Sequence, residues 1–130
     1  MPRFGDTSKT RLATCDDRLQ RLLNEVILRY DVRILQGYRS QQEQETAYRE
    51  RMSKLRWPKS KHNQHPSLAV DVAPYPIDWE DRERFFYMGG LIKGVAAMMG
   101  IRVRWGGDWD SDTDFKDQRF TDLPHFEILI

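Results

Sequence analysis

Three side chains in two short stretches of this sequence can bind a metal ion. His62 and Asp71 lie within residues 60–74, and His125 lies far downstream, within residues 122–127. The chain has 3 histidines in all, the third being His65. An ionised carboxylate such as that of Asp71 is costly inside an apolar run unless it is paired or coordinates a metal. We therefore expect His62, Asp71 and His125 to converge on one zinc ion.

Two imidazoles and one carboxylate are typical of a catalytic zinc site, which keeps a fourth position for water. Bound zinc lowers the pKa of that water to about 7. A base must still take the proton and deliver it to a leaving amine, and Asp122 is placed for this role, three residues before His125. Other interpretations stay open: ordinary surface or core histidines, Asp71 paired with a buried arginine, and Asp122 as a turn residue before Pro124.

Length and composition limit the classes of protein. The 130 residues are enough for one domain, which we place at residues 1–130. The 21 Lys and Arg nearly cancel the 20 Asp and Glu, so the net charge of +1 is too small to attract nucleic acid or a membrane surface. We expect a monomer. The single cysteine, Cys15, excludes an internal disulfide and a zinc–cysteine cluster.

The first ten residues lack the apolar segment of a signal peptide, and no apolar stretch reaches transmembrane length. We expect the protein to be made and folded in a cytoplasm. If it acts outside the cytoplasm, another agent must release it.

Periodicity and capping residues predict an α+β fold, with about three helices on one small antiparallel sheet. Asp16 or Thr14 caps the first helix, Ser40 and Glu43 form a capping box, Asp78 caps the last helix, and Gly100 ends it. The expected elements are an irregular lead-in (1–13), helices (16–30, 41–55 and 78–99), strands (32–35, 68–72, 101–105 and 126–130), a basic loop (56–66) and an Asp-rich loop (106–119).

Three ordered motifs resemble a known family. They are Gly-Tyr-Arg-Ser at residues 37–40, Ser-Lys-His at 60–62 with Ala-Val-Asp at 69–71, and Asp-x-x-His at 122–125. Together they resemble the zinc D-alanyl-D-alanine peptidases, whose fold is shared with the hedgehog signalling domain. The resemblance is greatest to phage and prophage L-alanyl-D-glutamate endopeptidases, and it extends over about residues 19–126.

The resemblance implies roles for individual residues. His62, Asp71 and His125 match the family's zinc ligands, and Asp122 matches its acidic catalytic residue. Arg39 matches an arginine that binds the scissile carbonyl and stabilises the oxyanion, for which a guanidinium is well suited. A structural salt bridge is the alternative role for Arg39.

Ser60 and the first histidine leave two choices open. Ser60 matches the serine of the family's Ser-x-His, where it either binds substrate or caps a loop. Many members of the family have six residues between the first histidine and the aspartate, whereas eight separate His62 from Asp71 and five separate His65 from Asp71. We favour His62 because it keeps the Ser-x-His context.

The acidic loop at residues 108–114 suggests calcium, which binds clustered carboxylates. Phe115 and Thr121 stand where an EF-hand loop needs glycine and glutamate, so we favour a solvated acidic loop. Asp108 can instead line the cleft and hold a ligand histidine in one tautomer, as the acceptor behind that histidine.

The resemblance implies a zinc peptidase that cleaves the L-alanyl-D-glutamate bond of peptidoglycan stem peptides, in the lysis of a host cell by a phage. A D-alanyl-D-alanine carboxypeptidase of the same fold is one alternative. The other is a zinc-containing binding module without catalytic activity, and the presence of Asp122 and Arg39 argues against it.

Overall fold

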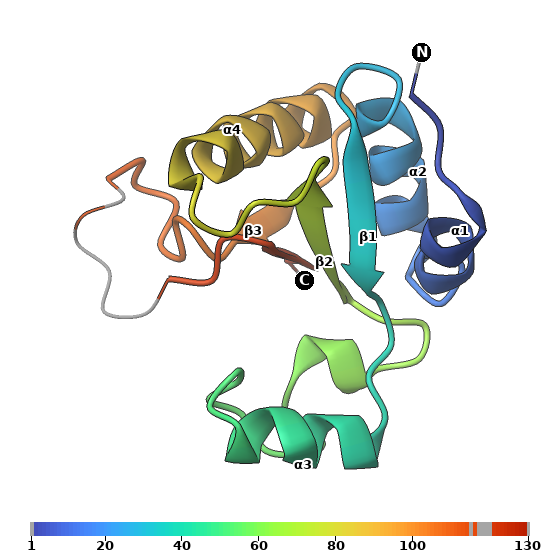
Figure 1. Cartoon of the computed structure of the whole chain (residues 1–130), viewed down its shortest axis with the longest axis vertical. Helices are drawn as coiled ribbons and strands as arrows, with labels where there is room; N and C mark the ends of the chain where they lie inside the picture. The colour runs from blue at the N-terminus through green and yellow to red at the C-terminus, as the bar shows by residue number, and fades with distance from the viewer. Residues whose placement is uncertain (1, 115, 117–120, 130) are drawn as a thin grey trace.

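A computed structural model describes residues 2–114, 116 and 121–129 of the chain. Figure 1 shows a twisted sheet with helices packed around it and a smaller lobe below it. In chain order the elements are α1 (Asp6–Leu12), α2 (Asp17–Val26), β1 (Val32–Gln36), α3 (Gln41–Arg49), the 3-10 helix η1 (Lys61–Asn63), β2 (Ala69–Pro74), α4 (Arg82–Met98), β3 (Val103–Trp105) and β4 (His125–Ile128).

The four strands form one antiparallel sheet in the order β1-β2-β4-β3. Asp71 of β2 pairs with His125 of β4, and Glu127 of β4 pairs with Arg104 of β3. Because side chains alternate between the two faces of a strand, His125 and Glu127 lie on the same face as Asp71. The sheet register therefore gathers charged side chains from three strands on one face.

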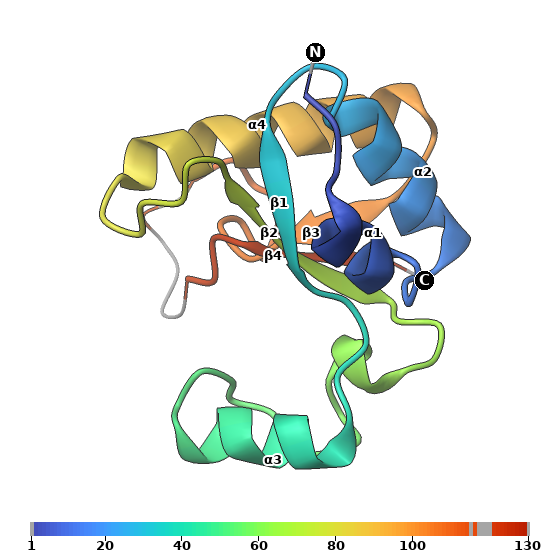
Figure 2. The ribbon, with the colours of Figure 1, turned by 45° about the vertical axis from the view of Figure 1, so that its right-hand side comes forward.

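The opposite face of the sheet forms the main core. Helices α2 and α4 pack on each other, and α4 contacts β2 and β3 (Figure 2). The apolar residues that alternate with the charged ones belong to this core: Val70, Val72, Val103, Trp105, Phe126 and Ile128. Gly89 of α4 allows this contact, because a Cβ there would collide with the ring of Trp105.

A smaller lobe, formed by α3, η1 and the loops around them, lies beyond the end of β1 (Figures 1 and 2). The capping box expected at its first helix is present: the Ser40 hydroxyl accepts from the Glu43 N–H, and the Glu43 carboxylate accepts from the Ser40 N–H. Helix α3 ends at Arg49, earlier than expected, and Arg51 adopts a positive φ of 61°. A left-handed residue cannot continue an α-helix, so the chain turns back there.

The irregular lead-in expected over residues 1–13 is wrong, because α1 occupies most of it. Its buried face carries Ser8 beside Leu12, so it lacks the apolar period that identifies a helix in a sequence. The Ser8 hydroxyl accepts from the Ile34 N–H of β1, 3.1 Å away, and this contact attaches the helix to the sheet edge.

Other boundaries also differ from the expected ones. Helix α2 is capped by Asp16, as expected, but ends earlier, at Val26. Helix α4 is capped by Asp81 and not by Asp78. The Asp78 carboxylate accepts instead from the Glu80 N–H, in the turn before the helix. Gly100 follows α4 with φ of 72°, as expected for a helix terminus. Residues 115 and 117–120 of the expected Asp-rich loop and residue 130 of the closing strand lie outside the described residues. Within the described part of the chain, none of the helices combines the length and apolarity needed to cross a bilayer.

Candidate metal centre and catalytic site

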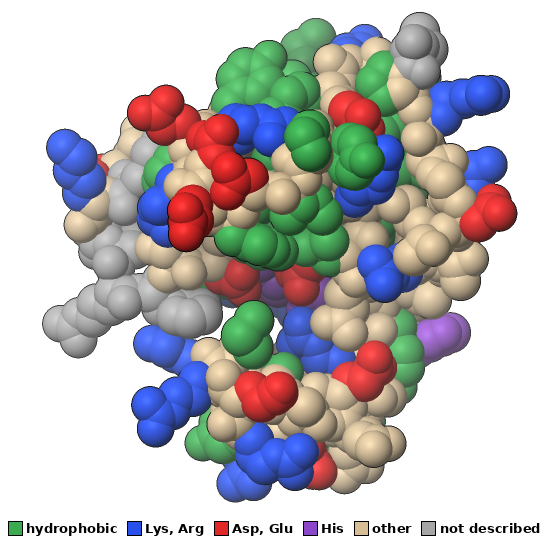
Figure 3. All heavy atoms as spheres, viewed as in Figure 1, with side chains coloured by type: hydrophobic (Ala, Val, Ile, Leu, Met, Phe, Trp, Pro, Cys, Tyr) green, Lys and Arg blue, Asp and Glu red, His purple; other side chains and the backbone are tan. Residues whose placement is uncertain are grey.

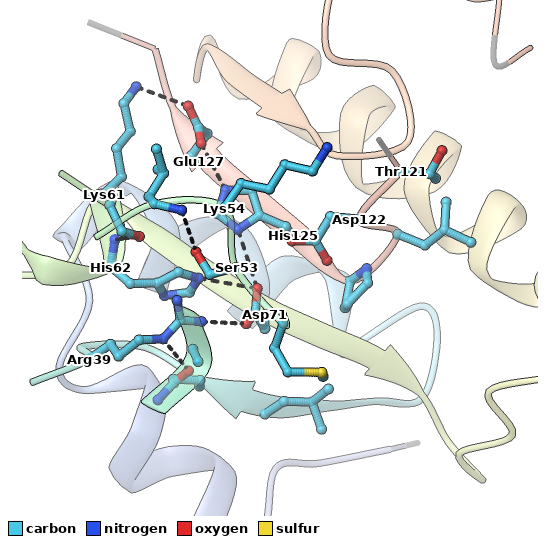
Figure 4. Close-up of a pocket in the computed structure, with 18 of the residues that line it drawn as sticks. Arg39, Ser53, Lys54, Lys61, His62, Asp71, Thr121, Asp122, His125 and Glu127 are labelled. Carbon is cyan, nitrogen blue, oxygen red and sulfur yellow. Dashed lines mark hydrogen bonds and ion pairs between the residues drawn. The ribbon is translucent and has the colours of Figure 1, made fainter. Parts of the chain in front are cut away.

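The structure brings His62, Asp71 and His125 together. Their potential ligand atoms all lie within 4.8 Å of one another. His62 comes from η1, while Asp71 and His125 are partners across β2 and β4. Figure 4 shows the three side chains pointing toward a common point. His65 is exposed and packs against Tyr38 instead, so His62 is the histidine that joins this group.

The hydrogen bonds at the two rings fit a cation between them. His62 Nδ1 lies 2.7 Å from the Gly37 carbonyl oxygen, which only accepts, so Nδ1 carries a hydrogen and Nε2 faces Asp71 Oδ1 at 3.2 Å. His125 Nε2 lies 2.8 Å from Glu127 Oε1, and its Nδ1 faces the same Asp71 oxygen at 3.4 Å. Two ring nitrogens directed at one carboxylate oxygen require a proton or a metal ion between them. The donor set therefore fits a divalent cation with nitrogen and oxygen ligands.

The electrostatics of this group also favour positive charge at its centre. Burial raises the pKa of Asp71, but the charges and hydrogen bonds of His62 and His125 more than offset this and hold the pKa far below its usual range. Burial lowers the pKa of His125, but the contacts to Asp71 and Glu127 outweigh it and raise the pKa to about 9. A metal ion would replace the proton that these carboxylates stabilise on the ring.

Arg39 is fixed at the edge of the site by three contacts. Its guanidinium donates to Gln36 at 2.8 Å, to Gln44 at 2.9 Å and to Asp71 Oδ2 at 3.4 Å. Figure 4 shows Arg39 and His125 both reaching Asp71, Arg39 at Oδ2 and His125 at Oδ1. The position of Arg39 is thus coupled to the candidate metal ligand, and the salt bridge considered from the sequence is present.

Gln44 also belongs to this network, although no motif in the sequence points to it. It is fully buried, accepts from Arg39 and Asn63, and donates to Ser53 and to the Leu55 carbonyl. It thereby connects α3, the following loop and η1 around the guanidinium. A polar residue in the middle of a polar helix gives no signal of this kind in a sequence.

Asp122 lies on the loop before β4 and lines the same cleft. Burial and the nearby Asp71 carboxylate raise the pKa of Asp122 to about 6. Its backbone N–H donates to the Gly106 carbonyl at 2.9 Å, and its carbonyl accepts from the His125 N–H at 3.1 Å. The carboxylate is therefore held close to the metal group and has a pKa suited to proton transfer near neutral pH.

Asp122 can lie at this position only because residue 106 is a glycine. A Cβ on residue 106 would collide with the carbonyl group of Asp122. We expect Gly106→Ala to displace Asp122 and to lower turnover by about 10²-fold, the cost of a misplacement of about 1 Å in a catalytic group. Gly90→Ala on α4 is the matched control, because nothing lies within 4 Å of its added Cβ. Activity of Gly106→Ala equal to that of the control, measured on purified stem peptide, would contradict this account.

The site lies at the bottom of a cleft of about 700 Å³ between the sheet and the smaller lobe. Figure 3 shows acidic and histidine side chains at the floor of the hollow, with apolar and basic side chains around it. The basic residues that line the cleft are Arg39, Lys54, Lys59, Lys61, Arg82 and Arg104. Trp109 also lines it and lies 5.4 Å from the His125 ring, centroid to centroid, whereas Trp105 is buried in the core.

Ser60 and Asp108 have local partners. The Ser60 hydroxyl accepts from the His62 N–H and caps η1, which is the loop-capping role considered from the sequence. The acceptor at the outer nitrogen of His125 is Glu127, so Asp108 does not take the alternative role considered for it from the sequence. Asp108 Oδ2 accepts from the Thr113 N–H within its own loop, 2.9 Å away.

The acidic loop brings three of its carboxylates close together. Potential ligand atoms of Asp108, Asp110 and Asp112 lie within 4.8 Å of one another, and Asp108 is buried while the other two are exposed. Phe115, which stands at an EF-hand position in the sequence, lies outside the described residues.

Comparison with known proteins agrees with this fold and identifies the family of the chain. A model of the phage L-alanyl-D-glutamate peptidase family matches residues 1–129. The L-alanyl-D-glutamate peptidase of Escherichia phage T5 is 33% identical over 122 residues, which are 89% of this chain and 88% of that protein. The crystal structure of the Serratia marcescens L-Ala D-Glu endopeptidase ChiX superposes with a TM-score of 0.77 at 24% identity, covering 98% of this chain and 90% of that chain, and confirms the α+β fold. The chain therefore belongs to the phage L-alanyl-D-glutamate peptidase family.

Proposed function

We propose that the protein is a zinc-dependent endopeptidase that cleaves the L-alanyl-D-glutamate bond of peptidoglycan stem peptides and acts as a phage endolysin. The observation that carries this proposal is the group of His62, Asp71 and His125 beside Asp122 in one cleft. Membership of the phage L-alanyl-D-glutamate peptidase family supports the bond.

In this proposal His62, Asp71 and His125 hold the zinc ion. Zinc at such a site supplies Lewis-acid chemistry, because it polarises a carbonyl oxygen and makes water acidic at neutral pH. Asp122 takes the proton from the attacking water and then delivers it to the leaving nitrogen of the D-glutamate residue. The raised pKa of Asp122 suits both steps, because the carboxylate must gain and lose a proton in each turnover.

Arg39 is the second catalytic group in this proposal. Its contacts to described residues use three of the five guanidinium N–H groups. The remaining donors can bind the carbonyl oxygen of the L-alanyl residue as negative charge develops on it. Because Gln36 and Gln44 fix the guanidinium, little reorganisation is needed when the substrate binds.

The charge of the cleft fits the substrate. In a stem peptide the D-glutamate residue uses one carboxyl group for the next link, which leaves the other free and anionic. Among the described residues, the three acids that line the cleft are Asp71, Asp122 and Glu127, and all lie close to the candidate metal group. Lys54, Lys59 and Arg82 are exposed basic residues on the walls of the cleft. We infer that these basic side chains attract the anionic part of the stem.

Product analysis tests the proposed bond. Purified peptidoglycan is digested with the zinc-loaded protein and the products are identified by mass spectrometry. We expect free stem peptides that begin with D-glutamate, and glycan chains that keep only L-alanine. Release of terminal D-alanine would instead identify a carboxypeptidase, and no soluble product would support a binding module.

The pKa of Asp122 predicts how activity depends on pH. The carboxylate accepts a proton only when it is ionised, so kcat/KM should fall on the acid side with a midpoint at about 6 or lower, since a bound cation lowers the pKa further. The profile is measured on stem peptide from pH 4 to 8, with zinc content determined at each pH so that metal loss is recognised. A midpoint that does not move in Asp122→Glu would assign the titration to another group.

A further inference from the structure

Glu127 has no role in the chemistry described above, yet it is buried directly behind a candidate metal ligand. Its Oε1 lies 2.8 Å from His125 Nε2, the ring nitrogen that faces away from Asp71. Only 6% of the residue is exposed. On the basis of the proposed zinc site, we propose that Glu127 is a positioning residue. It holds His125 in the tautomer with hydrogen on Nε2, so that Nδ1 is the atom that binds the metal.

The strand geometry makes this contact direct. His125 and Glu127 are two residues apart on β4, so their side chains lie side by side on the same face of the sheet. Figure 4 shows Glu127, His125 and Asp71 in one continuous chain of contacts. A carboxylate that accepts from the outer nitrogen of a ligand histidine orients the ring and makes its inner nitrogen a better ligand.

Two basic residues fix Glu127 itself. Its Oε2 accepts from Arg104 at 2.8 Å and lies 3.2 Å from Lys61 Nζ. Arg104 is its partner across β3 and β4, and Lys61 is the first residue of η1, next to His62. Since both basic residues contact Oε2, Oε1 remains directed at His125. The carboxylate therefore has a defined orientation as well as a defined position.

His62 provides an internal reference for this idea. Its outer nitrogen, Nδ1, is held by the Gly37 carbonyl, a backbone group that no side-chain substitution removes. A change at Glu127 should therefore alter the tautomer of His125 and leave that of His62 unchanged. A general loosening of the fold would affect both rings.

Glu127→Gln tests the proposal without changing the size of the side chain. Arg104 and Lys61 only donate, so they select the amide oxygen and turn the amide NH₂ toward His125 Nε2. That arrangement favours the His125 tautomer with hydrogen on Nδ1, and a nitrogen that carries hydrogen cannot bind a metal. We expect the affinity for zinc, measured by competition with a chelator, to fall about 10- to 100-fold. Glu25→Gln makes the same chemical change at an exposed ion pair with Arg29 on α2 and should bind zinc like the parent.

NMR of the 15N-labelled, zinc-loaded parent protein decides the tautomer directly, even if Glu127→Gln does not fold. We expect the hydrogen on Nε2 of His125 and on Nδ1 of His62. Hydrogen on Nδ1 of His125 would overturn the inference, as would a Glu127→Gln variant that folds and binds zinc within about twofold of the parent. If the parent itself bound no zinc, the proposed metal-dependent function would fail, which is a distinguishable result.

Discussion

Asp122→Asn is expected to lower turnover of purified stem peptide by about 10²- to 10⁴-fold, the usual contribution of a general acid–base group, while zinc remains bound. The amide has nearly the shape of the carboxylate but cannot accept a proton from water. The backbone contacts of residue 122 to Gly106 and His125 do not depend on the side chain, so the loop should keep its position. Steady-state kinetics and zinc content of the purified variant check both parts of the prediction.

The matched control is Asp17→Asn, in which the side chain is 82% exposed on α2. This variant should cleave stem peptide at the parent rate. Two results would contradict the role of Asp122: turnover of Asp122→Asn within about threefold of the control, or complete loss of zinc. The second result would assign Asp122 to the metal site and leave the proton without a carrier.

Asp71→Asn is expected to lose both zinc and activity. Among the described residues, Asp71 is the one side chain that contacts His62, His125 and Arg39 together. A neutral amide removes the negative charge that holds a cation between the two rings and also frees the guanidinium. Lewis-acid stabilisation is worth several kcal/mol, so the loss in turnover should reach about 10³-fold or more.

The parent protein, stripped of metal by a chelator, provides the comparison for Asp71→Asn. The parent protein stripped of metal should be as inactive as Asp71→Asn, and added zinc should restore the parent but not the variant. Zinc content by elemental analysis and activity on stem peptide are measured together. Full activity of the parent after exhaustive chelation would exclude the proposed zinc chemistry, and a zinc-loaded, active Asp71→Asn would exclude Asp71 as an essential ligand.

Where an element has local signals, the sequence identifies it well. The apolar period of residues 19–26 predicts α2, and the capping box at Ser40 and Glu43 predicts the start of α3. The end of α3 and the existence of α1 do not follow from such signals. The positive φ at Arg51 and the buried hydroxyl of Ser8 are decided by how the chain packs, and neither has a characteristic composition.

The residue types of the site are also determined by the sequence. Two histidines and an aspartate in apolar surroundings indicate a metal site before any coordinates are known, and the three motifs identify the family. One more signal was available: if the expected closing strand is extended by one residue to include His125, then His125 and Glu127 lie two residues apart on it and their side chains share one face.

Only the tertiary structure decides how these residues meet. Asp71 and His125 become neighbours through the register of β2 and β4, which joins positions 54 residues apart, the difference between 125 and 71. Contacts between distant segments decide that register and the choice of His62 over His65. They also decide the hydrogen bonds around Gln44 and the close approach of Gly106 to Asp122. A sequence determines which donors and caps are present, because those are properties of single residues and their near neighbours. The distances between the donors follow only from packing of the whole chain.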